Sequence, residues 1–501
     1  MMSGGATMTT AIATTTLHIS LDSKIRLHLP GRLRFELASL RTALQEDLIL
    51  PNPEFHEAER LGRSTRGIPR EINLIEWDRA TEVASLPRGY WPRLQKWLQR
   101  CGPLLDISYA LFNQALLLTP VNFGSRIVLR DYQADPVAAA VRAGGGVVEA
   151  PCGAGKTQMG LEVLARIGQP ALWLTHTVDL AGQALDRAEQ FLGIPRREIG
   201  MIGAGRERVG DRLTIALVQT LAQRGDLGDL PGRFGAVLID EVHHSPASTW
   251  QAVIGQFPAH YRYGVTGSLK RADGLERISH LVLGPTVAVV TDSQVKEAGG
   301  TLTPLLRVVK TEAVSAAWEA YLRREQAARD AGRSKPRLDF GPILDEVLRD
   351  PGRNRLIIEV LAREAPGHCS LVLSERVWHC AELFQGLATV APDLRATAVH
   401  GGLAKGLRRE IFERARAGEL DVIFAVDLAK EGLDIPRLDR LHLVGGGRNA
   451  VELRQKVGRV QRALPGKVTP MIFDYVDRGI GALAAQWYAR RRVYRELGIK
   501  A

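Results

Sequence analysis

One octet, Ala150-Pro151-Cys152-Gly153-Ala154-Gly155-Lys156-Thr157, constrains the fold more than any other segment of the chain. It follows the apolar pair Val147-Val148 and precedes a stretch with Leu161, Leu164 and Ala165 at helical spacing. In such a glycine-rich loop between strand and helix, the backbone N–H groups point at phosphate oxygens, the lysine reaches the β- and γ-phosphates and the threonine ligates magnesium. The octet therefore predicts a nucleoside triphosphate site, with Thr157 as a metal ligand. A plain strand-to-helix turn is the alternative.

Short apolar runs alternate with helical stretches on both sides of this octet. Buried parallel strands read as continuous apolar runs, because helices cover both faces of their sheet. The sequence therefore predicts an α/β fold with two doubly wound parallel-sheet lobes. The predicted strands are 146–149, 171–174, 214–217 and 236–239 in the first lobe, and 370–373, 396–399, 422–425 and 471–473 in the second.

Changes in composition along the chain predict its organisation. We expect a flexible N-terminus (1–16), a small α+β accessory domain (17–122), an ATP-binding lobe (123–300), a linker (301–345) and a second lobe (346–501). The linker assignment rests on a polar, helical stretch rich in Ala, Arg and Glu that ends at Ser334-Lys335-Pro336.

The charge balance favours an anionic partner. Lys and Arg number 66 against 55 Asp and Glu, a net charge of +11, and counting 12 Lys leaves 66 − 12 = 54 Arg. Arginine presents a planar fork of donors that matches phosphate oxygens, although codon usage in a GC-rich genome explains the same excess. The four scattered cysteines argue against disulfides or zinc, and the chain has no apolar run long enough for a membrane span and no signal peptide. We therefore expect a cytoplasmic protein with no membrane partner.

Two adjacent acids, Asp240-Glu241, end the apolar run 236–239 about 85 residues after the octet. Where a strand leaves the sheet, neighbouring side chains can both reach one site. We expect Asp240 to hold magnesium and Glu241 to polarise the attacking water, so that Lys156, Asp240 and Glu241 hydrolyse the nucleotide. Taken alone, two acids after a strand are more typical of a solvated loop or a helix cap.

With Val242-His243, these acids form a DExH box, and here the chain resembles a superfamily 2 helicase or translocase. The other blocks of that superfamily follow in the expected order. They are Leu129–Gln133, Leu174–Leu180 with Gln183, Val218–Leu221, Thr266–Ser268 with Arg271, Asp273 and Gly274, Leu373–Val377, Ala429–Pro436, and Gln455–Arg462.

The resemblance implies a role for individual residues and a RecA-like fold for both lobes. Gln133 would read adenine, and Gly432 and Asp434 would lie in the block that meets the ribose. Arg459 and Arg462 would act as arginine fingers that neutralise charge on the γ-phosphate. Because these two arginines are three residues apart, they would share one face of a helix and point into the cleft between the lobes.

In their detailed residues, these motifs are similar to those of the helicase subunits of type III restriction enzymes and of related repair and phage recombination helicases. The resemblance implies ATP and Mg²⁺ as cofactors and DNA, single-stranded or branched duplex, as partner. One block departs from the pattern, since Thr266-Gly267-Ser268-Leu269 stands where the family usually has Thr-Ala-Thr-Pro. An RNA helicase, or a nucleic-acid-binding subunit with weak ATPase in a defence or repair complex, stays open, as does a protein partner that supplies a nuclease.

Aromatic and basic residues mix in the accessory domain and at the C-terminus. Trp91, Leu94 and Trp97 are spaced as one apolar helix face, so we favour core packing for them. The interleaved bases, Arg93, Lys96 and Arg100, are candidate phosphate contacts, which makes this domain a candidate nucleic-acid-binding module. The same reasoning applies to the basic stretch 490–495.

Overall fold

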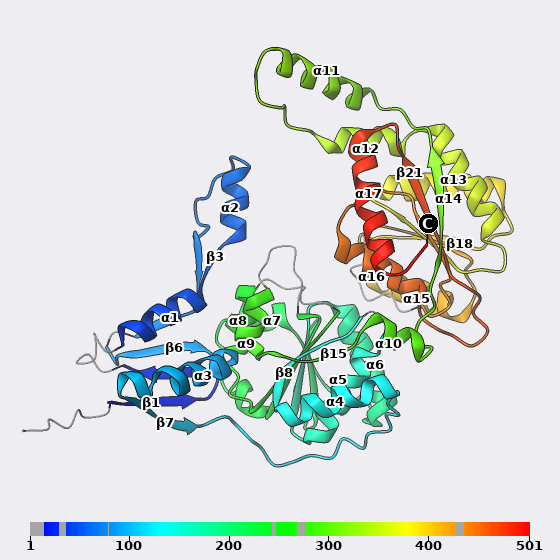
Figure 1. Ribbon diagram of the computed structural model, residues 1–501. Coiled ribbons are helices and arrows are strands. Elements are labelled where there is room, and N and C mark those ends of the chain that lie inside the picture. Colours follow the sequence, from blue (N-terminus) through cyan, green and yellow to red (C-terminus); the bar gives the residue numbers. More distant parts are fainter. Residues whose placement is uncertain are drawn as a thin grey trace, which may run out of the picture. The chain divides into compact units, whose positions relative to one another are not determined.

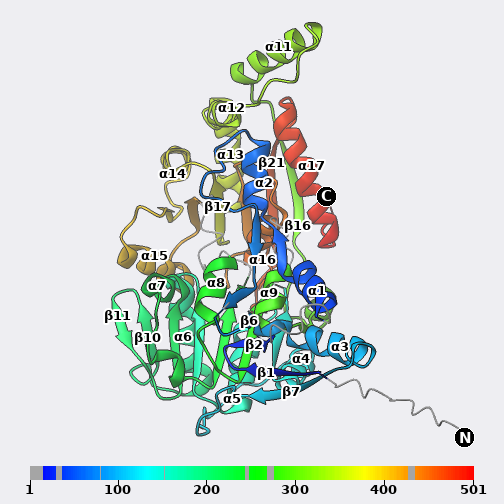
Figure 2. The same cartoon turned by 90° about the vertical axis from the view of Figure 1, so that its left-hand side faces the viewer.

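The computed structural model describes residues 15–29, 37–78, 80–151, 153–242, 247–267, 276–426 and 435–500 (Figure 1, Figure 2). The chain forms two compact units, the first made of residues 1–151 and 155–290 and the second of residues 152–154 and 291–501. The first unit holds an N-terminal module and the first parallel sheet, and the second unit holds the second parallel sheet. In the described part of the chain, every helix is too short or too polar to cross a lipid bilayer.

The N-terminal module is a five-stranded sheet in the order β5-β6-β2-β1-β7. Its neighbours are antiparallel except β1 and β7, which run parallel. Helices α1 and α3 bury Leu40, Leu44, Leu94 and Leu98 in its core. The bounds are β1 Thr15–Leu21, β2 Lys24–His28, α1 Ala38–Leu48, β5 Glu76–Asp78, β6 Val83–Pro87, α3 Trp91–Cys101 and β7 Ile107–Asn113.

The expected packing of the aromatic helix face is confirmed. Leu94 is fully buried, and the half-buried Trp91 and Trp97 pack against the same core cluster. The ring of Trp91 meets that of Tyr109 edge to face, with 6.1 Å between centroids. The buried faces of these aromatic side chains therefore serve the fold by packing against the core.

A helical extension leaves this module between α1 and β5. Strand β3 (Ile49–Pro51) pairs antiparallel with β4 (Glu71–Asn73), and α2 (Pro53–Arg60) lies between them. Figure 1 shows α2 and β3 extending away from α1 and from the sheet that contains β1 and β6. Asn52 caps α2 by accepting a hydrogen bond from the Glu54 N–H, and Pro53 occupies the first helical turn, where it costs no hydrogen bond.

The first lobe is an eight-stranded sheet in the order β11-β10-β12-β9-β13-β14-β8-β15, parallel throughout except for the β10–β11 hairpin. All four predicted strands are present, as β8, β9, β12 and β13. The strand bounds are β8 Gly145–Glu149, β9 Ala171–Thr175, β10 Gly200–Gly203, β11 Arg206–Arg208, β12 Leu213–Leu217, β13 Ala236–Asp240, β14 Tyr261–Thr266 and β15 Thr286–Val289. The helices are α4 Asp131–Ala143, α5 Lys156–Ile167, α6 Val178–Leu192, α7 Val218–Arg224, α8 Ala247–Ile254 and α9 Glu276–Leu283.

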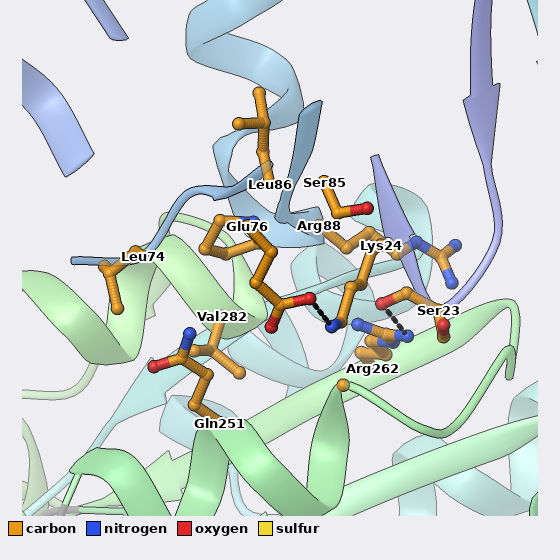
Figure 3. A pocket seen from close by; sticks show the side chains of 12 residues that line it. Ser23, Lys24, Leu74, Glu76, Ser85, Leu86, Arg88, Gln251, Arg262 and Val282 are labelled. Atoms are coloured by element: carbon orange, nitrogen blue, oxygen red, sulfur yellow. Dashed lines mark hydrogen bonds and ion pairs between the residues drawn. The ribbon is translucent and has the colours of Figure 1, made fainter. Parts of the chain in front are cut away.

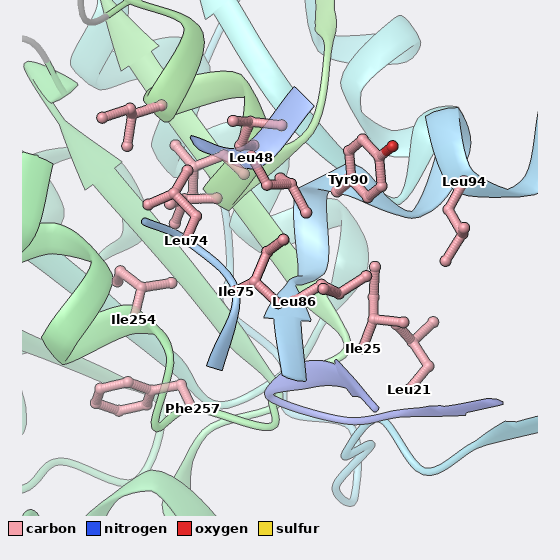
Figure 4. Packing of buried hydrophobic residues seen from close by; sticks show 14 of the residues in the cluster. Leu21, Ile25, Leu48, Leu74, Ile75, Leu86, Tyr90, Leu94, Ile254 and Phe257 are labelled. Carbon is pink, nitrogen blue, oxygen red and sulfur yellow. The ribbon is translucent and has the colours of Figure 1, made fainter. Parts of the chain in front are cut away.

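The N-terminal module and the first lobe share one hydrophobic core. Leu21, Ile25 and Leu86 of the module belong to the same buried cluster as Ile254 and Phe257 of the lobe (Figure 4). Apolar area buried in a continuous cluster stabilises both parts together, at roughly 25 cal/mol per Å². The module is therefore fixed to the lobe by its packing.

Polar contacts reinforce this junction beside a small pocket (Figure 3). The Arg88 guanidinium donates to the carbonyls of Ala259 (2.5 Å) and His260 (2.9 Å). In the other direction, Arg262 of β14 donates to the Ser23 carbonyl (2.9 Å). Each guanidinium donates to backbone carbonyls of the other part. These directional hydrogen bonds fix the orientation of the N-terminal module on the first lobe.

The second lobe is a six-stranded parallel sheet in the order β16-β21-β20-β17-β19-β18. The four strands expected here are present as β17, β18, β19 and β21. Strand β16 (Leu305–Thr311) lies in the stretch expected to be a linker, yet it pairs with β21 along its whole length and so forms an edge of the sheet. The other bounds are β17 Ser370–Ser374, β18 Ala396–Val399, β19 Val422–Val426, β20 Arg440–Leu443 and β21 Met471–Asp477.

Helices cover this second sheet, and several begin at side-chain caps. Ser315 caps α11 by accepting from the Trp318 N–H (3.1 Å), and Asp350 caps α13 by accepting from the Arg353 N–H (2.7 Å). The polar helical stretch predicted before residue 336 is α11. The bounds in this unit are α10 Asp292–Glu297, α11 Ala316–Asp330, α12 Phe340–Leu348, α13 Pro351–Glu364, α14 Val377–Val390, α15 Lys405–Ala417, α16 Ala450–Val460 and α17 Gly481–Glu496.

Candidate active site

The octet forms the connection between β8 and α5, as its sequence predicts. Gly155 has a φ of +80° and is the residue immediately before α5. A Cβ at this position would lie 2.4 Å from Nε2 of Gln133, so only glycine fits both the backbone and the space. The loop therefore turns directly into the helix N-terminus, where backbone N–H groups can bind an anion. Cys152 lies outside the described residues.

Lys156 begins α5, and its ammonium group faces the end of the strand that carries the acids. Its Nζ lies 3.2 Å from Oε1 of Glu241 and 3.4 Å from the carbonyl oxygen of Ala150. Only 10% of the Lys156 side chain and 18% of the Glu241 side chain are exposed. The structure thus brings two of the predicted catalytic residues, 85 positions apart, into one ion pair with limited access to water.

Glu241 is fixed by its backbone as well as by this ion pair. Its φ of +53° lies in the left-handed region, which is unusual for a residue with a side chain. Its N–H donates to the Val265 carbonyl (2.9 Å), and its Oε2 accepts from the Gly267 N–H (3.2 Å). An unusual conformation held by several bonds aims the carboxylate at the end of the P-loop helix.

Asp240 is the last residue of β13 and is 5% exposed. Burial, together with the neighbouring Glu241 carboxylate, raises the pKa of Asp240 to about 7, although Lys156 acts in the opposite direction. A cation that binds beside a buried carboxylate stabilises its ionised form. Asp240 is therefore a carboxylate suited to a divalent metal.

The half-buried Thr157 follows Lys156 in the first turn of α5 and supplies a hydroxyl at the same end of the sheet. Within the described ranges, no group of three or more His, Cys, Asp or Glu side chains forms a metal cage. One carboxylate and one hydroxyl, completed by phosphate oxygens and water, is the donor set that Mg²⁺ commonly uses at nucleotide sites. The donors present therefore fit a magnesium ion that arrives with a nucleotide.

Gln133 lies in the first turn of α4, where it is 2% exposed. Its Oε1 accepts a hydrogen bond from the Arg130 N–H (2.9 Å), which orients the amide and leaves Nε2 facing the P-loop at Gly155. The structure therefore places the predicted adenine reader beside the phosphate loop.

The remaining blocks of the first lobe end strands or begin helices at the carboxyl edge of the sheet. Thr175 ends β9, Thr177 caps α6 by accepting from the Leu180 N–H (3.2 Å), and Val218 begins α7. Thr266 ends β14 and is fully buried. The residues of this lobe's motifs that lie outside the described ranges are His243, Ser268, Leu269, Arg271, Asp273 and Gly274.

The predicted arginine fingers lie near the end of α16, and here the structure corrects the expectation. Arg459 lies on α16, which ends at Val460, so Arg462 lies beyond the helix and does not share a helical face with it. Instead, Arg462 forms an isolated antiparallel bridge with Thr301, and the Leu302 N–H donates to the Gln461 carbonyl (2.7 Å). Gln461 and Arg462 pair with the segment before β16 in an extended arrangement, so the helix does not continue past Val460. Gly432 and Asp434 lie outside the described residues.

Sequence reasoning missed Lys467, which holds the segment that carries Arg462. The Lys467 ammonium donates to the carbonyls of Pro436 (3.0 Å), Val460 (2.8 Å) and Arg462 (2.8 Å). It thereby satisfies carbonyls at and just beyond the C-terminus of α16 and ties this end to Pro436, the last residue of the Ala429–Pro436 block. A lysine shortly after a helix is the only local signal, and it does not reveal the third partner.

The structure also corrects one of the expected phosphate contacts, Arg490. Arg93 pairs with Asp47 (2.6 Å), and Arg490 is 6% exposed and holds the buried Asp474 through two bonds of 2.8 Å. Arg492 pairs with Glu496 (3.1 Å). The buried Arg490 is inaccessible to a phosphodiester backbone. Arg93 and Arg492 each pair through Nε and keep exposed side chains, so both remain candidate phosphate contacts.

Two family models match the chain in succession. Residues 126–271 match the type III restriction enzyme res subunit, and residues 352–464 match the helicase conserved C-terminal domain. The first match contains the P-loop and the paired acids, and the second contains Arg459 and Arg462.

Similar proteins span both matches. The DNA 3'-5' translocase XPB2 of Sulfurisphaera tokodaii is 24% identical over 367 residues, which cover 67% of this chain and 79% of that protein. The DNA 3'-5' helicase XPB of Kineococcus radiotolerans is 27% identical over 359 residues, which cover 70% of this chain and 60% of that protein. Among solved structures, phage T4 UvsW aligns over 96% of this chain and 97% of its own, with 16% identity and a TM-score of 0.41. By its two matched domains and their order, the chain belongs to the superfamily 2 helicases related to the helicase subunit of type III restriction enzymes.

Proposed function

We propose that this chain is an ATP-dependent DNA helicase or translocase that couples ATP hydrolysis to movement on, or remodelling of, duplex or branched DNA. The observation that carries the proposal is the 3.2 Å contact between Lys156 and Glu241 beside the buried Asp240. A phosphate-binding lysine, a metal-binding acid and a water-orienting acid, gathered at one sheet edge, are what phosphoryl transfer to water requires. DNA as the substrate is supported by the relatives named DNA 3'-5' translocase and helicase.

In this proposal each residue of the site has a defined role. The backbone N–H groups of the P-loop and the Lys156 ammonium bind the phosphates, and Gln133 reads the adenine. Thr157 and Asp240 hold Mg²⁺, which neutralises charge on the phosphate oxygens. Glu241, held in place by its contact with Lys156, orients the attacking water and accepts its proton. Arg459 and Arg462 stabilise the charge that develops on the γ-phosphate, and Gly432 and Asp434 contact the ribose.

The domain boundaries are part of the proposal. Residues 17–122 form an accessory module that contacts nucleic acid, and 123–300 and 346–501 belong to the two lobes of the motor. Of the stretch 301–345, expected to be a linker, β16 (Leu305–Thr311) is part of the second lobe's sheet. We place the protein in the cytoplasm, where it meets DNA and ATP, and a protein partner could add a nuclease.

The proposal is tested by measuring ATP hydrolysis with duplex DNA, single-stranded DNA, branched DNA and RNA. Each polymer is added at two salt concentrations, because phosphate contacts make affinity steeply dependent on salt. We expect DNA to stimulate hydrolysis and RNA to stimulate it less. Equal or greater stimulation by RNA would instead support an RNA helicase, and no stimulation by any polymer would contradict a nucleic-acid motor.

Preparations of the Lys156→Ala variant control for contaminating ATPases. The substitution removes the lysine that binds phosphate, so hydrolysis that survives it does not belong to this chain. A strand-displacement assay on a branched duplex then separates a helicase from a translocase that moves without opening the duplex.

A further inference from the structure

The most distinctive charged surface outside the motor lies on the extension of the N-terminal module. The segment from the end of α2 to the start of β4, residues 60–70, carries four arginines and no acid. We name this segment the arginine loop. All four side chains, Arg60, Arg63, Arg66 and Arg70, are exposed.

None of these four arginines has an acidic partner among the residues that the structure describes. Arginines elsewhere in the same unit commonly do, and they include Arg26, Arg93, Arg166, Arg212 and Arg277. Four acids flank the loop in the same extension (Glu54, Glu57, Glu59 and Glu71), but none of them forms an ion pair with a loop arginine in the described structure, and Glu59 contacts His56 instead. The guanidinium groups of the arginine loop therefore keep their donors available for an external anion.

The loop is ordered by hydrogen bonds of its own backbone. The buried Asn52 donates from Nδ2 to the Pro69 carbonyl (2.8 Å) and from its N–H to the Arg70 carbonyl (3.0 Å). At the other end of the loop, the Arg63 N–H donates to the Ala58 carbonyl (2.8 Å). A loop that is already folded presents its arginines at a lower entropic cost on binding than a flexible tail would.

Core packing does not explain why this extension exists. The hydrophobic core cluster has no buried member between Leu50 and Leu74, and Ala58 is the one buried side chain described in α2. In Figure 1, α2 points away from the sheet of its own module. A segment that projects from the core, contributes little to it and carries unpaired arginines is suited to contact a partner.

The chemistry of the loop selects the kind of partner. Guanidinium groups spaced three or four residues apart match the repeated phosphates of a nucleic-acid backbone. Proteins that bind single strands add aromatic side chains on which bases stack, and the arginine loop contains no aromatic residue. We propose that the arginine loop binds the phosphate backbone of duplex DNA next to the motor, independently of sequence. This inference rests on the proposed function, because it assigns a contact site for the same DNA.

The test compares two variants with the same loss of charge. In the first, Arg63 and Arg66 of the arginine loop are replaced by serine (R63S/R66S). In the control, Arg324 and Arg329 of α11 are replaced (R324S/R329S), because both are exposed and lie on a helix of the second unit, outside the N-terminal module. The affinity of the full chain for a fluorescently labelled DNA duplex is measured without nucleotide at several salt concentrations.

We expect R63S/R66S to weaken duplex binding about tenfold at low salt and to lower the slope of log affinity against log salt by about 2. The control should bind like the wild type, and R63K/R66K should retain most of the affinity because the charge is kept. Unchanged melting temperatures verify the fold, since neither arginine has a partner to lose.

Three results would overturn the inference. These are wild-type binding by R63S/R66S, an equal loss in the control, and a loss that affects single-stranded DNA or RNA but spares the duplex. The assay contains no nucleotide and does not depend on hydrolysis. The binding assay can therefore refute the role of the arginine loop without refuting the proposed function. The proposed function would fail in a different experiment, if no nucleic acid stimulated ATP hydrolysis.

Discussion

The two parallel-sheet lobes both contain buried carboxylates, but they differ in how the charge of these carboxylates is balanced. In the first lobe, Asp240 is buried beside a second carboxylate, and its pKa is raised to about 7. In the second lobe, Asp474 is fully buried, but Arg490 and the Tyr494 hydroxyl, each 2.8 Å away, satisfy both of its oxygens. Arg353 holds Asp477 in the same manner, with Nε 3.1 Å from Oδ1.

This difference indicates that the acids of the first lobe bind a ligand, whereas those of the second lobe stabilise the fold. The ion pairs of the second lobe brace its loops, since Arg490 also donates to the Gly447 carbonyl (3.0 Å) and Arg353 to the Val444 carbonyl (2.7 Å). These loops precede α16, which carries Arg459. In the first lobe, the acidic pair is balanced only in part by Lys156, so a cation gains energy by binding there. Substitutions in the two lobes should therefore affect different quantities.

The largest effect is expected for Lys156→Ala. The loss of the ammonium group that binds phosphate should lower DNA-stimulated ATP hydrolysis at least about a thousandfold. The melting temperature should also fall, because the substitution leaves the largely buried Glu241 carboxylate without its cation, so hydrolysis is measured at a temperature where both proteins are folded. Hydrolysis within tenfold of the wild type would contradict the site, and Lys310→Ala, at an exposed position of β16, provides a matched control.

Arg490→Met should destabilise the second lobe by about 3 kcal/mol, because it leaves the buried Asp474 without its cation. Chemical denaturation of the full chain measures this loss. Binding of ATP by the first lobe should persist in the folded fraction. The matched control is Arg491→Met, which removes an exposed arginine from the same helix. Equal stability of the two variants would show that the Asp474 cluster does not brace the fold.

Arg462→Ala should spare ATP binding and slow turnover about a hundredfold, since an arginine finger acts on charge that develops during hydrolysis. The affinity for a fluorescent ATP analogue and the steady-state rate constant separate the two effects. Full hydrolysis by this variant would remove Arg462 from the catalytic set.

His379 should make the second lobe sensitive to acid. Burial, reinforced by Arg353, lowers the pKa of His379 to about 3, so the folded state excludes a proton that the unfolded chain binds below its ordinary value of 6.5. Its stabilising effect is complete above pH 6.5 and is lost as the pH falls toward 3, at about 1.4 kcal/mol per pH unit. His379→Gln should reduce that slope between pH 6.5 and 5, as measured by chemical denaturation at each pH.

The sequence predicts the strands best where the residues are continuously apolar. Strand β14 was not predicted, because Arg262 and Gly264 interrupt its pattern, yet Arg262 is 4% exposed and hydrogen-bonds to the Ser23 carbonyl. Strand β20 is similar, since it contains the buried Arg440 and His442. A polar side chain whose partner is distant in the chain looks like a surface residue in a local pattern.

The candidate site follows the same rule. Its first-lobe residues follow from the sequence, because the P-loop and the acidic pair each form at the end of one strand. The end of α16 does not follow, because it depends on Thr301 and on Lys467, which approach from elsewhere in the chain. In the sequence, Arg490 resembles an exposed base. In the structure it is buried by its ion pair with Asp474, 16 residues earlier, which a local pattern does not reveal.

The most direct test of the contrast between the lobes measures the melting temperature of Asp240→Asn and Asp474→Asn with and without magnesium and a non-hydrolysable ATP analogue. Asp240→Asn should melt at or above the wild-type temperature without ligand, because it removes a buried charge, and it should lose most of the stabilisation by ligand. Asp474→Asn should melt lower but keep that stabilisation. If Asp240→Asn retained the full ligand shift, or if Asp474→Asn lost it, the assignment of ligand-binding charge to the first lobe and structural charge to the second would be contradicted.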